Sequence, residues 1–381
     1  MSQVSIVRCN SYQQEKVDDA VRKSVELIGG LNKIVHPQDK VLLKVNVLNA
    51  DPPEKAVTTH PAVLKAVIRL VKEAGGKPVV GDAPGIAYKD AEKAWQITGL
   101  KKAAEEEGVE VVTFRWARQV ESSFSKKVPY LHIAREALDA DVVISIPKLK
   151  THSFALFTGA IKNLYGTIPG FRKKELHARA PKPRDFARLM ADILFTIHPA
   201  LAIMDGIIGM EGNGPAAGSP RKVGLVLASR DLVALDAVAS SIIGYDPLDV
   251  DIIRIAAEKG LGVAELGKID VKGTDLEKVK LDDFELVSNI NTLLNKIPSF
   301  LLFIGRFVAP YLLKVEPEIN RERCTGCGIC IEHCPTGAVR LSSRVPEINR
   351  KKCIKCFCCQ EFCPQKAVEI KYSWLARKLR I

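Results

Sequence analysis

The sequence predicts an α/β domain, in which a largely parallel sheet carries helices on both faces, followed by a small α+β domain. Two observations lead to this prediction. Across residues 1–290, short apolar runs alternate with amphipathic runs of helical period, which is the pattern of a parallel sheet with crossover helices. Residues 315–381 instead hold nine of the ten cysteines, eight of them in two evenly spaced sets. A chain of 381 residues has room for both domains.

The expected elements of the first domain follow from these runs. Strands are expected at residues 41–48, 78–81, 109–114, 141–146, 201–204 and 223–228. Helices are expected at residues 14–28, 61–74, 90–107 and 232–243. Ligands of such sheets bind beyond the carboxyl ends of the strands. The candidate site therefore lies in segments that follow three of the runs, which are GDAPG (81–85), PKLKTH (147–152) and DGIIGMEGNGPAAG (205–218).

An apolar segment separates the two domains, and residues 291–314 are expected to form a connecting helix or linker. Its core, residues 299–315, is shorter than the roughly 20 apolar residues that span a bilayer and contains Arg306 and Pro310. We expect no transmembrane segment, although an interfacial role at a membrane surface stays open. The first residues lack the apolar stretch of a secretory signal, so a cytoplasmic location is expected.

The positive charge is concentrated in two places. The chain has a formal net charge of +12, and residues 147–188 contain ten Lys or Arg against two acidic residues. Residues 315–381 contain thirteen basic and seven acidic residues. There is no long Lys/Arg run and no interleaving of basic and aromatic residues, so we expect no nucleic-acid partner.

The cysteines form the spacing C-x2-C-x2-C-x3-C-P twice, 29 residues apart. This spacing is typical of two [4Fe–4S] clusters, in which the fourth cysteine of each run ligates the other cluster. A pair of structural zinc sites is the alternative, but such sites usually use two pairs of ligands. The pattern therefore predicts one cluster held by Cys324, Cys327, Cys330 and Cys363, and a second held by Cys353, Cys356, Cys359 and Cys334.

From about residue 316 to residue 371 the chain resembles the bacterial-type two-cluster ferredoxin family. The resemblance implies one-electron transfer at low potential, with a redox partner protein. Two features depart from the family. Cys358 is off the ligand register and is expected to be a buried spare thiol. The module is also basic, whereas free carrier ferredoxins of the family are typically acidic, so we expect a fixed relay that receives electrons from an acidic donor.

The basic stretch of the first domain predicts a pocket for an anionic small molecule, although a solvated basic face is the usual explanation of a charge run. Its charged residues are interleaved with apolar residues and glycines, so part of the stretch lines a cleft. Lysines would neutralise the charge of the ligand, a histidine would donate a proton, and an aspartate would orient it. The candidate catalytic residues are His152, Lys162, His177 and Asp82. The candidate substrate-binding residues are Lys148, Lys150, Asp205, Glu211 and Asn213.

Three stretches of the first domain, PKLKTHSFALFTGAIKNLYG, GMEGNGP and DLVALDAVAS, resemble the family labelled "domain of unknown function 362". That resemblance covers about residues 1–290 and implies an iron–sulfur redox protein, without a reaction. A fainter resemblance is to the nickel-pincer lactate racemase family, whose cofactor-bearing lysine and flanking histidines would fall on His152, Lys162 and His177. Asp82 stands where that family has a catalytic histidine.

Two main functions remain open from the sequence. In the first, a ferredoxin-type reductase or oxidoreductase uses the clusters to serve an anionic substrate or cofactor, which predicts a pocket with Lys162 directed inward. In the second, the chain is a non-catalytic electron-transfer protein that docks on a partner enzyme, which predicts an exposed apolar patch near a cluster. We favour the first, because a domain of nearly 300 residues with a basic, glycine-rich cleft exceeds what docking requires. Racemase-like chemistry is a minor alternative, and a further cofactor in the first domain is left open.

Overall fold

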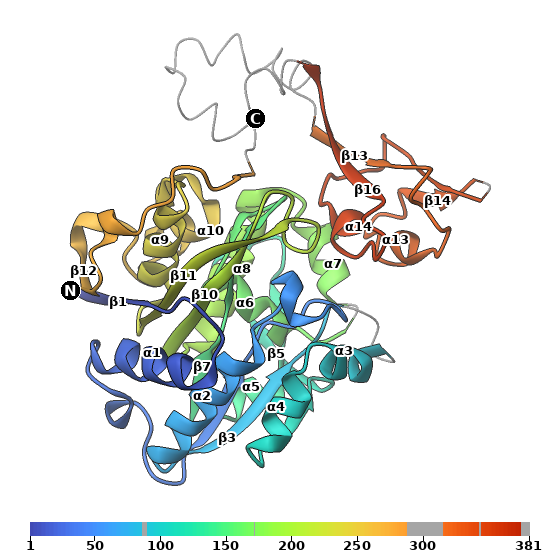
Figure 1. Cartoon of the computed structure of the whole chain (residues 1–381). Coiled ribbons are helices and arrows are strands. Elements are labelled where there is room, and N and C mark those ends of the chain that lie inside the picture. Colours follow the sequence, from blue (N-terminus) through green and yellow to red (C-terminus); the bar gives the residue numbers. More distant parts are fainter. Residues whose placement is uncertain (86–89, 171, 288–314, 343, 375–381) are drawn as a thin grey trace.

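The computed structural model describes residues 1–85, 90–170, 172–287, 315–342 and 344–374 (Figure 1). A ten-stranded sheet forms the centre of the larger domain. Along its main path the strands are, in spatial order, β12 (Ile269–Gly273), β1 (Ser2–Arg8), β11 (Ser219–Ser229), β10 (Leu201–Glu211), β7 (Val142–Ser145), β2 (Lys40–Lys44), β3 (Lys77–Asp82) and β4 (Val111–Thr113). The remaining strands, β8 (Lys148–His152) and β9 (Leu156–Thr158), form a hairpin attached to β10.

The sheet is largely parallel, as predicted. All neighbours from β10 to β4 run parallel, and so do β1 and β12. Strand β11 is antiparallel to both of its neighbours, because it returns from β10 through a short connection. The fold class inferred from the sequence is therefore confirmed, with β11 inside the sheet and β9 of the attached hairpin as its antiparallel strands.

Helices cover both faces of this sheet. Side chains of β2 alternate, with Leu42 in one apolar core and Val41 and Leu43 in the other. The core that contains Val41 and Leu43 is closed by α1 (Gln14–Glu26), α2 (Pro61–Glu73), α3 (Ala91–Ile97) and α4 (Leu100–Glu106). The opposite core is closed mainly by α6 (Ala160–Asn163), α8 (Pro183–Ile197), α9 (Leu232–Ile242) and α10 (Asp251–Glu258).

Several local expectations differ from the structure. The strand expected at residues 201–204 continues to Glu211 as β10. The helix expected at residues 90–107 is divided into α3 and α4 by Gly99, whose φ of +71° favours glycine. The strand expected at residues 41–48 ends at Lys44. The segment PKLKTH, expected to follow a strand as a loop, itself forms β8. A separate hairpin of β5 (Ala117–Glu121) and β6 (Tyr130–Ala134) precedes α5 (Arg135–Leu138).

The smaller domain reproduces the sequence repeat in its secondary structure. Helices α13 (Ile329–Glu332) and α14 (Cys358–Glu361) are 29 residues apart. Two short antiparallel pairs complete it, β13 (Val315–Ile319) with β16 (Val368–Tyr372) and β14 (Val339–Leu341) with β15 (Pro346–Ile348). Figure 1 shows α13 and α14 facing α7 (Arg172–Arg179) of the larger domain, with β14 on the outer side.

The apolar linker predicted at residues 291–314 lies outside the described residues, so the predicted domain limits of 1–290 and 315–381 stay predictions. Among the helices that the structure describes, none is long and apolar enough to cross a membrane.

Candidate functional site

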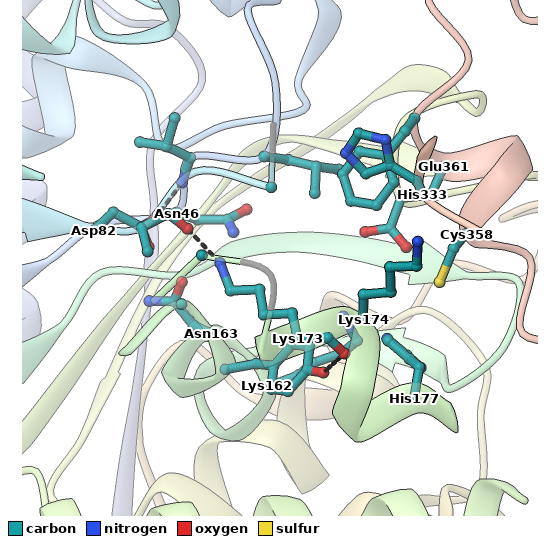
Figure 2. Close-up of a pocket in the computed structure, with 18 of the residues that line it drawn as sticks. Asn46, Asp82, Lys162, Asn163, Lys173, Lys174, His177, His333, Cys358 and Glu361 are labelled. Carbon is teal, nitrogen blue, oxygen red and sulfur yellow. Dashed lines mark hydrogen bonds between the residues drawn. The ribbon is translucent and has the colours of Figure 1, made fainter. Parts of the chain in front are cut away.

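A cavity of about 150 Å³ lies between the two domains, with walls from both (Figure 2). The larger domain contributes residues at the carboxyl ends of β2 and β3 and residues of α6 and α7. The smaller domain contributes α14 and the end of α13. We call this cavity the interdomain pocket; its polar lining includes Lys44, Asn46, Asp82, Lys162, Asn163, Tyr165, Lys173, Lys174, His177, Glu332, His333, Cys358 and Glu361. Its position beyond the ends of parallel strands is the usual one for a ligand site in this class of fold.

Asp82 lines one side of the pocket and forms a buried ion pair with Lys44. Its Oδ1 is 2.9 Å from Lys44 Nζ, and its Oδ2 accepts a hydrogen bond of 2.7 Å from the backbone N–H of Val47. Gly166 passes so close that a Cβ there would stand 2.2 Å from Asp82 Oδ1, so only glycine fits. The lysine charge therefore holds the carboxylate in place, and Asp82 has a clear structural role beside its predicted catalytic one.

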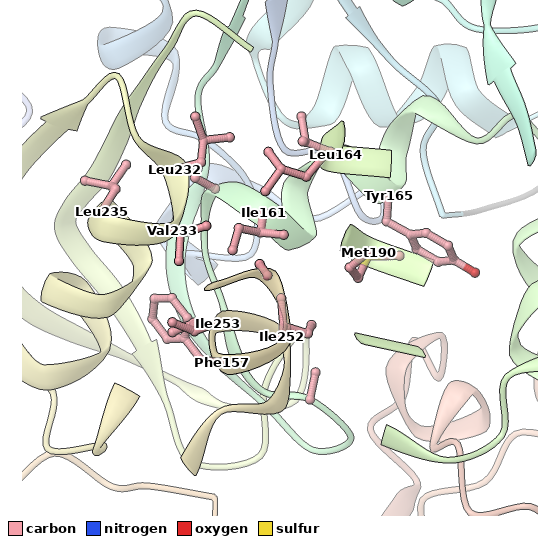
Figure 3. Packing of buried hydrophobic residues seen from close by; sticks show 14 of the residues in the cluster. Phe157, Ile161, Leu164, Tyr165, Met190, Leu232, Val233, Leu235, Ile252 and Ile253 are labelled. Atoms are coloured by element: carbon pink, nitrogen blue, oxygen red, sulfur yellow. The ribbon is translucent and has the colours of Figure 1, made fainter. Parts of the chain in front are cut away.

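Lys162 belongs to α6, a short helix that is held in place by hydrogen bonds and by apolar packing. Asp236 of α9 accepts hydrogen bonds from the backbone N–H groups of Ala160 (2.6 Å) and Ile161 (3.0 Å) at the start of this helix. The apolar side of α6 is buried among side chains of α9 and α10 (Figure 3). These contacts leave Lys162 on the pocket side, where its Nζ has no hydrogen-bond or ion-pair partner among the described residues.

Three lysines approach the pocket from α6 and α7. Burial lowers the pKa of Lys162 and lowers that of Lys173 to about 8. Lys173 Nζ donates a hydrogen bond to the carbonyl of Ala83, and Lys174 Nζ donates one of 2.8 Å to the carbonyl of Glu332 in the smaller domain. Lys173 and Lys174 therefore donate to carbonyl oxygens rather than to carboxylates, which leaves their positive charge, and that of Lys162, for an anionic ligand.

The two candidate histidines lie near Lys162 but are held neutral. Burial lowers the pKa of His177 to about 3, and it lowers the pKa of His152 well below its usual range. His177 stacks on Phe186 with ring centroids 4.8 Å apart, and its Nδ1 has no hydrogen-bond partner among the described residues. His152 Nδ1 accepts from the N–H of Phe154 at 3.1 Å, while its Nε2 is buried and unpartnered among the described residues. His177 lines the pocket, whereas His152 does not.

Lys148 and Asp205 belong to a separate buried network. Lys148 Nζ is 2.8 Å from Asp205 Oδ2 and donates to the hydroxyl of Tyr12, also at 2.8 Å. That hydroxyl donates to Asp205 Oδ1 at 2.9 Å, and His60 stacks on the Tyr12 ring. Every member of the network has a partner inside it, so these contacts account for the buried charges of Lys148 and Asp205. Neither residue lines the interdomain pocket.

The other three predicted substrate-binding residues also lie outside that lining. Lys150 is buried and donates from Nζ to the carbonyl of Val57 at 2.6 Å. Glu211 Oε2 accepts from the backbone N–H of Glu285 at 3.1 Å. The backbone carbonyl of Asn213 accepts a 3.0 Å hydrogen bond from Gln360 Nε2, which places Asn213 at the contact between the domains.

The eight predicted ligand cysteines are gathered into two groups of four. One small cavity is lined by Cys324, Cys327, Cys330 and Cys363, and the other by Cys334, Cys353, Cys356 and Cys359. Each group thus takes its fourth cysteine from the other run. Equivalent backbone N–H groups, those of Ala338 and Ala367, donate to Cys334 Sγ at 3.1 Å and Cys363 Sγ at 3.2 Å. Such bonds suit a sulfur that carries negative charge as a metal ligand, so the residues fit the predicted clusters.

Cys358, expected to be a buried spare thiol, lies at the interdomain pocket. It is buried, as expected, but it lines the interdomain pocket and directly precedes the predicted ligand Cys359. Glu361 and Phe362 follow on the same side, and Phe362 packs so tightly on Gly85 that a Cβ there would be 2.5 Å from the Phe362 ring. The group formed by Cys334, Cys353, Cys356 and Cys359, which we call the second group, is therefore the one beside the pocket.

A larger open groove of about 1010 Å³ adjoins the interdomain pocket, with which it shares Gly170 and Lys174. Its lining includes Arg115, Trp116 and Arg172 of the larger domain and Pro335, which follows Cys334 in the smaller domain. We refer to it as the Trp116 groove.

Sequence reasoning missed several lining residues. Lys44 and Asn46 were placed inside an overlong strand, and nothing in their local pattern shows that β2 ends at Lys44. Glu361 and His333 belong to the cysteine repeat, so their approach to the larger domain depends on how the two domains meet. Lys173 and Lys174 were part of the basic stretch, and the spacing of α7 directs them to the pocket.

The fold and the site define an α/β protein joined to an iron–sulfur module. Residues 41–241 match the family described as "Domain of unknown function (DUF362)", and residues 317–340 match a 4Fe-4S binding domain. A thylakoid-associated protein of Synechocystis sp. is 39% identical over 261 residues, which are 68% of this chain and 79% of that protein. The chain belongs to the DUF362 family and carries a 4Fe-4S binding domain after it.

Other similarities are shorter or more distant. A heterodisulfide reductase-like protein of Archaeoglobus profundus is 45% identical over 38 residues, which are 9% of this chain and 5% of that protein. The lactate racemase apoprotein of Thermoanaerobacterium thermosaccharolyticum aligns with 61% of this chain and 55% of its own, at 13% identity and a TM-score of 0.40. A Thermotoga maritima protein aligns with 66% of this chain and 60% of its own, at 14% identity and a TM-score of 0.38.

Proposed function

We propose that the protein is an iron–sulfur oxidoreductase. Two [4Fe–4S] clusters of the smaller domain would transfer electrons to an anionic substrate or cofactor bound in the interdomain pocket. The observation that carries this proposal is that residues of both domains line the same pocket. Lys162, Lys173 and His177 come from the larger domain, and Cys358 and Glu361 come from the helix that contains the ligand residue Cys359. A molecule bound by the lysines would therefore lie beside the second group of cysteines.

The two groups of cysteines support a count of two clusters. Each group has four thiols around its own cavity, and both have the same N–H to sulfur hydrogen bond at equivalent positions of the repeat. When bound, such clusters supply one-electron transfer at low potential.

The lysines of the pocket are suited to bind negative charge. Interactions between charges strengthen in a buried site of low dielectric constant, so Lys162 and Lys173 would contribute more there than on the surface. Lys173, with its pKa lowered to about 8, is also the better proton donor near neutral pH, since the pKa of His177 is about 3. His177 would instead orient the ligand through its neutral ring.

A non-catalytic electron-transfer protein is the second candidate, and one observation favours it. The Trp116 groove places an exposed indole and apolar side chains next to the Cys334–Pro335 turn, as this hypothesis predicts. The racemase-like alternative has less support. His152, Lys162 and His177 lie near one another, but Asp82 is engaged with Lys44 where that chemistry needs an imidazole.

Native mass spectrometry of the anaerobically purified protein tests the proposal. We expect about eight irons and eight sulfides, together with the mass of a bound organic or inorganic anion. Lys162→Ala should lose the additional mass and keep the clusters. An additional mass that persists in Lys162→Ala would contradict the proposed site.

A further inference from the structure

The Trp116 groove combines features that the proposed pocket does not require. It spans the two domains, from the residues before the β5–β6 hairpin and the start of α7 to Pro335. It is wide and open, whereas the interdomain pocket is small. Its floor and walls include the apolar side chains of Phe114, Trp116, Pro169, Ala178 and Pro335.

Trp116 exposes a large aromatic side chain inside the groove. It is 69% exposed, whereas Trp95 is 1% exposed in the core. An exposed indole leaves a large apolar surface in water, and tryptophan is enriched at the energetic centres of protein interfaces. The position of Trp116 therefore indicates a surface that a partner covers.

The charge around Trp116 specifies the chemistry of that partner. Arg115, Arg172 and Lys174 line the groove. Glu175 is the acidic residue of the lining, and its carboxylate is 2.7 Å from Arg179 outside it. Arg172 has no ion-pair partner among the described residues. A cationic rim around an apolar centre is complementary to an acidic protein surface.

The groove also reaches the edge of one predicted cluster. Pro335 directly follows Cys334, which is grouped with Cys353, Cys356 and Cys359. We propose that the Trp116 groove is the docking surface of an acidic one-electron carrier protein, of the flavodoxin or ferredoxin kind. In the transfer, the reduced carrier would lose one electron and be oxidised, and a cluster held by Cys334, Cys353, Cys356 and Cys359 would accept that electron. No bond forms or breaks.

The docking surface is independent of what the pocket binds, and it is testable with flavodoxin as an acidic probe. Binding of oxidised flavodoxin to the cluster-loaded protein should weaken about tenfold in Trp116→Ala, the effect of removing an interface anchor. The rate constant for reduction by flavodoxin hydroquinone should fall about tenfold in Arg172→Glu at low ionic strength. Because salt screens surface charges, this second difference should shrink in high salt.

Matched controls separate docking from general effects. Tyr130→Ala removes an exposed aromatic side chain outside the groove, from the β5–β6 hairpin that follows Trp116, and Lys33→Glu reverses an exposed charge elsewhere. Both should behave as the wild type, and all variants should be reduced by dithionite at the wild-type rate. Unchanged flavodoxin binding and reduction in both groove variants would overturn the proposal. So would an equal loss in Lys33→Glu, which would assign the effect to overall charge rather than to the groove.

Discussion

At the scale of single residues, the cysteines show how spacing determines a site. The x3-C-P ending of each run directs Cys334 and Cys363 to the group formed by the other run. This crossing was predictable because it depends on local spacing that repeats after 29 residues. The pocket position of Cys358 was not predictable, since it depends on a contact between domains.

The crossing predicts which cluster a single substitution damages. Cys334→Ser should impair the cluster held by Cys353, Cys356 and Cys359, because it removes the fourth ligand of that group. Iron analysis and electron paramagnetic resonance (EPR) should show loss of one of the two clusters. Cys358→Ser is the matched control and should retain all the iron, because Cys358 lines the pocket and neither cluster cavity. Damage confined to the cluster of Cys324, Cys327 and Cys330 would contradict the grouping.

Lys173 predicts how anion binding depends on pH. Burial lowers its pKa to about 8, against the opposing attraction of Asp82 and Glu361 and with added repulsion from Lys44 and Lys162. Lys173 is charged below that pH and neutral above it, so affinity for an anion should be constant at lower pH. It should fall as pH rises through about 8, by up to tenfold per pH unit.

Calorimetry with sulfate, whose charge is constant in this range, measures the effect. Lys173→Met should bind sulfate more weakly and without the decline above the wild-type transition. A wild-type affinity that increases with pH would refute the assignment.

At the scale of elements, α6 is a short helix that depends on its neighbours. Four residues cannot form a stable helix alone, so the position of Lys162 rests on Asp236 and on the apolar contacts of Ile161 and Leu164 (Figure 3). Periodicity cannot detect so short a helix. Of the longer helices, α1, α2 and α9 were predicted nearly to their ends from their extended apolar runs, whereas α8, which follows the basic stretch, was not predicted.

Asp236→Ala should therefore loosen α6 by about 2 kcal/mol, because two buried N–H groups lose their acceptor. Hydrogen exchange at Ala160 and Ile161 should accelerate, and anion binding should weaken with the displacement of Lys162. Ser241→Ala removes a side-chain hydrogen bond within α9 and serves as the control. Protection of α6 equal to that of the wild type would show that its packing suffices without Asp236.

At the scale of the whole molecule, the pocket exists because the two domains meet. Gln360 donates a hydrogen bond to the backbone carbonyl of Asn213, and Lys174 donates one to the backbone carbonyl of Glu332. Phe357 of the smaller domain belongs to the apolar core of the larger one. The sequence predicts both domains and the basic stretch, but not this contact. For that reason Lys162, His177 and Asp82 were identified, whereas the wall formed by Glu361 and His333 was not.

Gly85 tests the contact between the domains. A Cβ at this position would lie 2.5 Å from the Phe362 ring and 2.9 Å from the carbonyl of Leu48, so Gly85→Ala should push α14 away from the larger domain. Hydrogen exchange in α14 should increase and anion affinity should fall. Gly267→Ala, where an added Cβ meets no atom within 4 Å, is the control. Wild-type exchange and affinity in Gly85→Ala would mean that the interface tolerates the extra atom.

The most direct test of the central claim is a potentiometric EPR titration of the two proposed clusters in the wild type and in Lys162→Met, at pH 6. If the pocket lies beside the cluster held by Cys334, Cys353, Cys356 and Cys359, loss of the nearby lysine charge disfavours the added electron there. The potential of that cluster, identified by its loss in Cys334→Ser, should fall while the other stays constant. Equal shifts of both clusters, or a shift only of the cluster held by Cys324, Cys327, Cys330 and Cys363, would contradict the account.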